Sequence, residues 1–120
     1  MIVFKPDVEK IKSARDHVAE IAADWPINEY FVRVVTSELV TNSVRHARTD
    51  EIRVDAYSNT DASVYTVEVW DADVRLPVLR SPQPGSPCGR GLLLVAKLAT
   101  NWGADHDHGG KIVYAEWTRP

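Results

Sequence analysis

Hydrophobic positions along the chain follow two different periods, and each period indicates one type of secondary structure. From residue 7 to residue 25, apolar side chains recur every three or four positions, which predicts a helix that Pro26 ends. A second helix is predicted over residues 28–47, with Asn28 as its N-terminal cap. Its apolar side carries Phe31, Val34, Val35 and Leu39.

Alternating apolar and polar positions follow, over residues 51–57 and 64–71, and predict two strands joined by the turn SNTDAS. The period of two places Asp71 on the same face as Val67 and Val69, so that a carboxylate is directed inward. A helix is predicted from about Gly91, and a C-terminal hairpin from strands near 100–104 and 111–118.

The segment between the second strand and the last helix has no sustained period. Residues 72–89 contain four prolines and two glycines, and structure is predicted on both sides of them. We therefore interpret them as a long loop, and we expect residues 72–87 to close over a ligand, because loops of this length in compact domains are usually functional. The order of elements predicts an α+β two-layer sandwich, a mostly antiparallel sheet covered on one face by helices.

Length and composition indicate one soluble globular domain over residues 1–120. Hydrophobic residues make up 44% and charged residues 26% of the chain. A net charge of -3 disfavours nucleic acid as a partner. No apolar run approaches the roughly 20 residues of a membrane span, and the first ten residues are too charged for a signal peptide, so we expect no membrane contact and a cytoplasmic location. A single cysteine, Cys88, excludes an internal disulfide.

Glu38, Asn42 and His46 recur at every fourth position of the second helix. At about 100° per residue they fall on the apolar side of that helix, where a polar group needs a partner. The pattern of this helix alone favours neither of two explanations. Either local partners such as an arginine or the backbone satisfy the three groups, or the groups bind a ligand.

Three motifs taken together extend this pattern. The Glu38-x-x-x-Asn42-x-x-x-His46 series precedes the inward Asp71, a flexible loop, and the run Gly89-Arg90-Gly91-Leu92 at a helix start. In this order and spacing they resemble the ATP site of the GHKL superfamily, which includes gyrase, histidine kinases and mismatch-repair ATPases. Within this superfamily the short chain resembles the bacterial anti-sigma factor serine/threonine kinases and their stand-alone ATP-binding relatives, and the resemblance covers nearly its whole length.

The resemblance implies ATP and Mg2+ as ligands and assigns a role to each motif. Asn42 would be the protein ligand of Mg2+, which prefers oxygen donors. Glu38 would be the general base, and Asp71 would accept a hydrogen bond from the adenine amino group. The phosphates would lie at the helix start formed by Gly89, Arg90, Gly91 and Leu92. His46 is either part of the ATP site or only a brace for the helix end.

The chain also departs from the family pattern. The usual Asp-x-Gly-x-Gly reads Asp71-Ala72-Asp73-Val74-Arg75 here, and the threonine often found on the last strand of the site is not evident in KIVYAEW. Two functions therefore remain. One is a kinase that holds a sigma factor and phosphorylates an anti-sigma factor antagonist, and the family leaves room for a homodimer. The other is a non-catalytic module that sequesters a partner.

Overall fold

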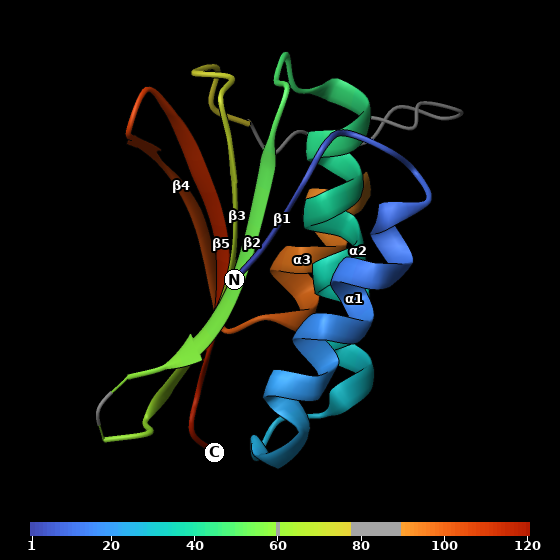
Figure 1. The fold of residues 1–120 in the computed structure, drawn as a ribbon. Coiled ribbons are helices and arrows are strands. Elements are labelled where there is room, and N and C mark those ends of the chain that lie inside the picture. Colours follow the sequence, from blue (N-terminus) through green and yellow to red (C-terminus); the bar gives the residue numbers. More distant parts are fainter. Residues whose placement is uncertain (60, 78–89) are drawn as a thin grey trace.

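The computed structural model describes residues 1–59, 61–77 and 90–120, which form one sheet and a layer of helices (Figure 1). In chain order the elements are β1 (Ile2–Phe4), α1 (Lys10–Ile21), the short 3-10 helix η1 (Ala22–Asp24), α2 (Glu29–His46), β2 (Ile52–Ser58), β3 (Val64–Asp71), α3 (Arg90–Leu98), β4 (Asn101–Asp107) and β5 (Gly110–Thr118). The predicted α+β two-layer sandwich is confirmed.

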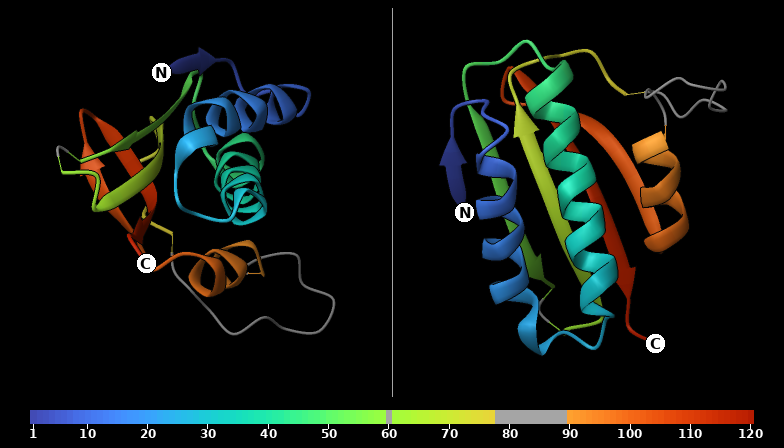
Figure 2. Two further views of the ribbon diagram at one scale, coloured as in Figure 1. Left: turned by 90° about the horizontal axis from the view of Figure 1, so that it is seen from below. Right: turned by 90° about the vertical axis from the view of Figure 1, so that its right-hand side faces the viewer.

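The five strands pair antiparallel throughout, in the order β1-β2-β3-β5-β4. All helices lie on one face of this sheet, and Figure 2 shows α2 running across its middle with α1 and α3 on either side. The register of β3 and β5 sets Asp71 opposite Lys111. This pairing decides the chemistry of the site, because it joins the end of one central strand to the beginning of the other.

The core lies between the layers, and it follows the predicted periods. Strands β2 and β3 supply buried alternate residues, and α2 supplies a buried stripe at helical spacing. The largest fully buried side chains of the core include Val32, Val35, Leu39, Ile52, Val54, Val67 and Val69. Each such side chain contributes roughly 1.5–3 kcal/mol when it leaves water.

The second helix begins as predicted, because the Asn28 side chain accepts a hydrogen bond from the backbone N–H of Tyr30 at 2.9 Å. Its apolar side is rotated from the predicted one. Val32 and Val35 are buried, whereas Phe31 and Val34 are only half-buried. The polar series is therefore at the border of the buried face rather than in its centre.

The N-terminal region differs from the prediction. Residues 2–4 form an edge strand that pairs with β2, and a three-residue strand is too short to show a period of two. The first helix begins at Lys10 rather than near residue 7, where the Asp7 side chain instead accepts a hydrogen bond from the N–H of Glu9. It ends in η1 before Trp25.

Candidate functional site

Helix α2 carries the three polar residues of the series in one line towards its C-terminal end. Glu38 and Asn42 are half-buried, and His46 is exposed. The prediction that His46 points into the protein is wrong, because the rotation of α2 leaves the imidazole exposed at the rim of a pocket. The backbone carbonyl of His46 accepts a hydrogen bond from Arg75 at 3.3 Å.

The first turn of α3 lies directly against Glu38 and Asn42. A Cβ atom on Gly91 would lie 2.6 Å from Oε2 of Glu38 and 3.7 Å from Oδ1 of Asn42. The missing Cβ therefore makes room for the Glu38 carboxylate, at a helix end where backbone N–H groups and the helix dipole favour an anion. We call Glu38, Asn42 and Gly91 the Glu38 end of the site.

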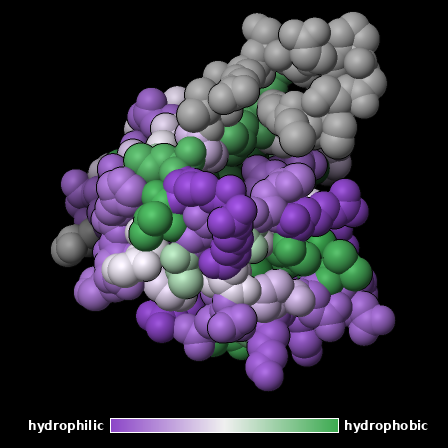
Figure 3. Space-filling model, turned by 90° about the horizontal axis from the view of Figure 1, so that it is seen from above, coloured by the Kyte–Doolittle hydropathy of each residue, from purple (hydrophilic) through white to green (hydrophobic). Residues whose placement is uncertain are grey.

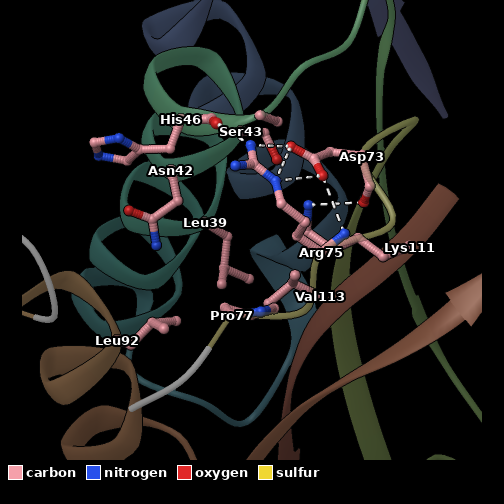
Figure 4. A pocket seen from close by; sticks show the side chains of 11 residues that line it. Leu39, Asn42, Ser43, His46, Asp73, Arg75, Pro77, Leu92, Lys111 and Val113 are labelled. Atoms are coloured by element: carbon pink, nitrogen blue, oxygen red, sulfur yellow. Dashed lines mark hydrogen bonds and ion pairs between the residues drawn. The ribbon is translucent and has the colours of Figure 1, made fainter. Parts of the chain in front are cut away.

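A pocket of about 320 Å³ opens between α2, α3 and β5 (Figure 4). Its walls are mixed, with apolar side chains from all three elements and polar side chains at the edges. The lining residues are Leu39, Asn42, Ser43, His46, Ala47, Asp73, Arg75, Pro77, Leu92, Lys111 and Val113. Figure 3 views the molecule from the end at which α2 and β3 finish, and the surface there is mainly hydrophilic, with smaller groups of hydrophobic residues between.

Asp71 is fully buried on the inner face of β3, as the alternation predicted, and both of its carboxylate oxygens accept internal hydrogen bonds. Oδ1 accepts from Nζ of Lys111 at 2.8 Å and from the N–H of Asp73 at 3.0 Å. Oδ2 accepts from the hydroxyl of Ser43 at 2.7 Å. The carboxylate thus forms a buried ion pair with Lys111, which is itself only 7% exposed.

A second ion pair occupies the positions at which the family pattern has glycines. The Asp73 carboxylate accepts hydrogen bonds from the Arg75 side chain, the closest at 2.6 Å, and from the N–H of Arg48 at 2.9 Å. These bonds, led by the Arg75 guanidinium, hold the pKa of Asp73 far below its usual range. We call Asp71, Asp73, Arg75 and Lys111 the Lys111 end of the site.

The strand that carries Lys111 can reach Asp71 only because it begins with a glycine. A Cβ atom on Gly110 would overlap the backbone carbonyl oxygen of Asp71 and lie 2.8 Å from Cα of Ala72. The close approach of two backbones explains why β5 starts with this residue. It also delivers Lys111 to the buried carboxylate.

The structure brings together six of the predicted site residues. Asn42, His46 and Leu92 line the pocket. Glu38 and Gly91 lie beside Asn42, and Asp71 lies behind Lys111. Arg90 is the first residue of α3. Gly89, Cys88 and most of the predicted closing loop lie outside the described residues.

Four residues of the site were not predicted, namely Ser43, Asp73, Arg75 and Lys111. A signal for Lys111 was present, because the period of two in β5 places it on the same face as Val113, Ala115 and Trp117. No comparable signal marks Ser43, whose partner is 28 residues away in sequence.

The outer face of the sheet carries a separate, acidic hollow of about 320 Å³ that includes Tyr57, Glu68, Tyr114 and Glu116. The Tyr57 hydroxyl donates to Glu68 at 2.9 Å. Partial burial raises the pKa of Glu68. The pKa of Tyr57 is raised to about 12, by partial burial and by the hydrogen bond to the charged Glu68. None of the predicted site residues lies in this hollow.

His106 near the end of β4 and His108 in the β4–β5 turn are both exposed, and His108 contacts the Asp107 carboxylate at 2.7 Å. Within the described ranges, no three His, Cys, Asp or Glu side chains are grouped so that they could hold a metal ion. The same ranges contain no helix with the length and apolar character needed to cross a membrane.

An antiparallel sheet with helices on one face, and an acidic residue and an amide of α2 packed against the start of α3, define the class of GHKL-type ATPase domains. A family model, the histidine kinase-like ATPase domain, matches residues 4–117. The chain belongs to this family.

Solved structures show the same fold. The catalytic domain of the histidine kinase ThkA, in a nucleotide-free crystal form, superimposes with a TM-score of 0.59 at 16% identity, covering 98% of this chain and 94% of that one. A second nucleotide-free form of the same domain gives a TM-score of 0.58 at 15% identity, with 98% and 95% covered. No curated protein matches the chain.

Proposed function

We propose that the protein is an ATP-dependent serine/threonine kinase of the anti-sigma factor type. The observation that carries this proposal is the meeting of Glu38 and Asn42 with the first turn of α3 at Gly91. A carboxylate and an amide oxygen beside a helix N-terminus, next to a pocket that the Asn42 amide lines, are the groups that phosphoryl transfer needs, since its catalysis depends mainly on positioning and electrostatics.

The Glu38 end fits a metal-bound triphosphate. The Asn42 amide lines the pocket and has an oxygen that suits Mg2+, which commonly binds one or two protein oxygens in addition to phosphates. When bound, Mg2+ would neutralise charge on the phosphate oxygens. Backbone N–H groups at the start of α3 would bind the same oxygens, and the missing Cβ at Gly91 keeps that approach open.

Glu38 would act on the hydroxyl group that receives the phosphate. Its carboxylate takes the proton of a serine or threonine hydroxyl on the partner protein while the hydroxyl oxygen attacks the γ-phosphorus of ATP and ADP leaves. The apolar walls from Leu39, Leu92 and Val113 would hold the base of the nucleotide. In the cytoplasm, the partners would be a sigma factor, held by the protein, and the anti-sigma factor antagonist that it phosphorylates.

A second function is favoured by the Lys111 end. The family resemblance implies that Asp71 accepts a hydrogen bond from adenine. In this structure its oxygens already accept hydrogen bonds from Lys111, Ser43 and the N–H of Asp73. A site whose buried carboxylate already accepts three internal hydrogen bonds suits a module of the same fold that sequesters a partner without transferring phosphate.

Replacing Glu38 by glutamine separates the two functions. For the kinase, Glu38→Gln should reduce phosphate transfer to an antagonist protein by about 100-fold or more and leave ATP affinity nearly unchanged, because a general base acts in the transition state. Transfer is measured with labelled ATP. The matched control is Glu20→Gln on the exposed side of α1, which should transfer at the wild-type rate. Absence of transfer by the wild-type protein to every antagonist tested would favour the module.

A further inference from the structure

The sheet has one face that no described helix covers. The helices found in residues 1–59, 61–77 and 90–120 all lie on the other face, as Figure 1 shows for α1, α2 and α3. Side chains alternate along a strand, so every second residue of β2, β3 and β5 belongs to this outer face. The outer face is therefore open to a molecule that matches its side chains.

The hollow on the outer face is strongly acidic. It is lined by four carboxylates and by no lysine or arginine, the acidic residues being Glu68, Asp105, Asp107 and Glu116. Among the residues that the structure describes, none of the four forms an ion pair with lysine or arginine. Both carboxylates of the Lys111 end, in contrast, have a cationic partner. The negative charge of the hollow is thus not balanced by its own lining.

The charges on the outer face also oppose one another. Burial raises the pKa of Glu68, and the negative charges of Asp55 and Asp107 raise it further. The Tyr57 hydroxyl, which donates to Glu68, is neutral and offsets only part of this rise. A cation beside Glu68 would relieve the repulsion, whereas nucleic acid or an anionic membrane would be repelled.

Aromatic rings lie beside these carboxylates. Tyr57 and Tyr114 line the hollow, and Tyr57 is 44% exposed. On the same face, the guanidinium of Arg53 lies over the ring of Trp70, 4.3 Å from the ring centroid. Carboxylates next to exposed rings suit arginine better than a metal ion, because a guanidinium can donate to the acids and stack on a ring at the same time.

We propose that the outer face docks an arginine-rich segment of a partner protein, with one arginine in the hollow beside Glu68 and Glu116. These two residues lie on adjacent strands, because Glu68 of β3 is opposite Tyr114 of β5 and Glu116 of β5 is opposite Thr66 of β3. The five N–H donors of a guanidinium can bind both carboxylates. Glu38 lies across the sheet, so the docked segment is not the one that receives phosphate, and the inference does not rest on the nucleotide site.

Calorimetric titration of the chain with a peptide of alternating arginine and serine tests the proposal. A second peptide carries citrulline at each arginine, which keeps the shape and removes the charge. We expect the citrulline peptide to bind at least about tenfold more weakly, the size of a hydrogen bond to a charged group. Raising NaCl from about 0.05 M to about 0.5 M should weaken the arginine peptide as well, because salt screens exposed charges. Absence of binding by the arginine peptide, or equal binding of both peptides, overturns the proposal. Tighter binding of spermine, a flexible polyamine without a planar fork, overturns the choice of arginine.

A double variant assigns the binding to the hollow. Glu68→Gln with Glu116→Gln keeps an oxygen for the Tyr57 hydroxyl and for the Asn101 amide, and it should weaken the arginine peptide by about tenfold or more. Its matched control is Glu9→Gln with Glu20→Gln, which changes the net charge equally at two exposed glutamates and should bind as wild type.

Amide nitrogen–proton NMR spectra locate the peptide and show that both double variants are folded. In the wild-type protein, the arginine peptide should shift the signals of β3 and β5 and leave those of α1 unchanged. Equal weakening of the peptide by the two double variants, or shifts confined to the helical face, overturns the proposal.

Discussion

At the Glu38 end of the site, two polar side chains of α2 face a glycine, and the missing Cβ of the glycine makes room for the Glu38 carboxylate. Half-burial keeps Glu38 and Asn42 within reach of solvent and of a ligand. Such an arrangement stabilises the fold little. Its polar groups are positioned for a bound molecule, as is usual for a binding or catalytic site on a rigid helix.

The Lys111 end is organised in the opposite way. Asp71 with Lys111 and Asp73 with Arg75 form two ion pairs, and both carboxylates also accept backbone N–H groups. A polar network that is satisfied internally rigidifies the structure around it. The comparison teaches that one site can combine an end suited to chemistry with an end whose charges serve the fold.

The largest loss of stability is expected from a substitution at Gly110, which brings β5 and Lys111 next to Asp71. Gly110→Ala would push a Cβ atom into the backbone of Asp71, which cannot move aside, so we expect a loss of about 3 kcal/mol or more in the free energy of unfolding. Gly109→Ala is the control, since a Cβ there meets open space and only its φ of 76° opposes alanine, at a cost of about 1 kcal/mol. Urea denaturation measures both. Similar losses of unfolding free energy for the two variants would contradict the close approach of Gly110 to the backbone of Asp71.

A smaller effect is expected from the second ion pair. Asp73→Asn should cost about 1–3 kcal/mol at neutral pH, because it removes the charge that Arg75 and two N–H groups stabilise. The pKa of Asp73 is lower in the folded protein than in the unfolded chain. The stabilisation is therefore complete above the unfolded-state pKa, near 4, and is lost as the pH falls towards the folded-state pKa.

The difference in unfolding free energy between wild type and Asp73→Asn should accordingly shrink in acid. Denaturation curves at pH 7 and pH 3 measure it, with Asp50→Asn as the exposed control. A difference that is the same at both pH values would show that the Asp73 charge does not stabilise the fold.

The smallest change in stability is expected at the Glu38 end. Gly91→Ala adds a methyl group 2.6 Å from the flexible tip of Glu38, which can move, so the free energy of unfolding should change by no more than about 1 kcal/mol. Phosphate transfer should nevertheless fall, because the base is displaced. Gly103→Ala presses in the same manner on the Tyr114 hydroxyl on the outer face and should leave transfer unchanged. Equal transfer rates for the two variants would remove Glu38 from the reaction.

Much of the fold could be predicted from local pattern. The alternation in β2 and β3 gave both strands and the inward Asp71, and the Asn28 cap located the start of α2. Burial drives these elements, and burial is visible in the order of apolar residues. The edge strand β1 was missed because three residues carry no period.

The partners within the site could not be predicted in the same way. The contact of Lys111 with Asp71 depends on the register of β3 against β5, which neither strand specifies alone. The rotation of α2 that leaves His46 exposed likewise depends on how the helix packs on the sheet. Pairwise tertiary contacts of this kind are decided by the assembled fold.

The central claim is that the pocket binds a nucleotide with its triphosphate at the Glu38 end. Amide nitrogen–proton NMR spectra of the wild-type protein, recorded with Mg2+ and either ATP or adenosine, test it most directly. We predict that ATP shifts the amide signals of Gly91 and Asn42 strongly and that adenosine, which has no phosphates, leaves them nearly unchanged. Unchanged Gly91 and Asn42 signals at saturating ATP, or shifts confined to the outer face around Tyr57 and Tyr114, would contradict the claim.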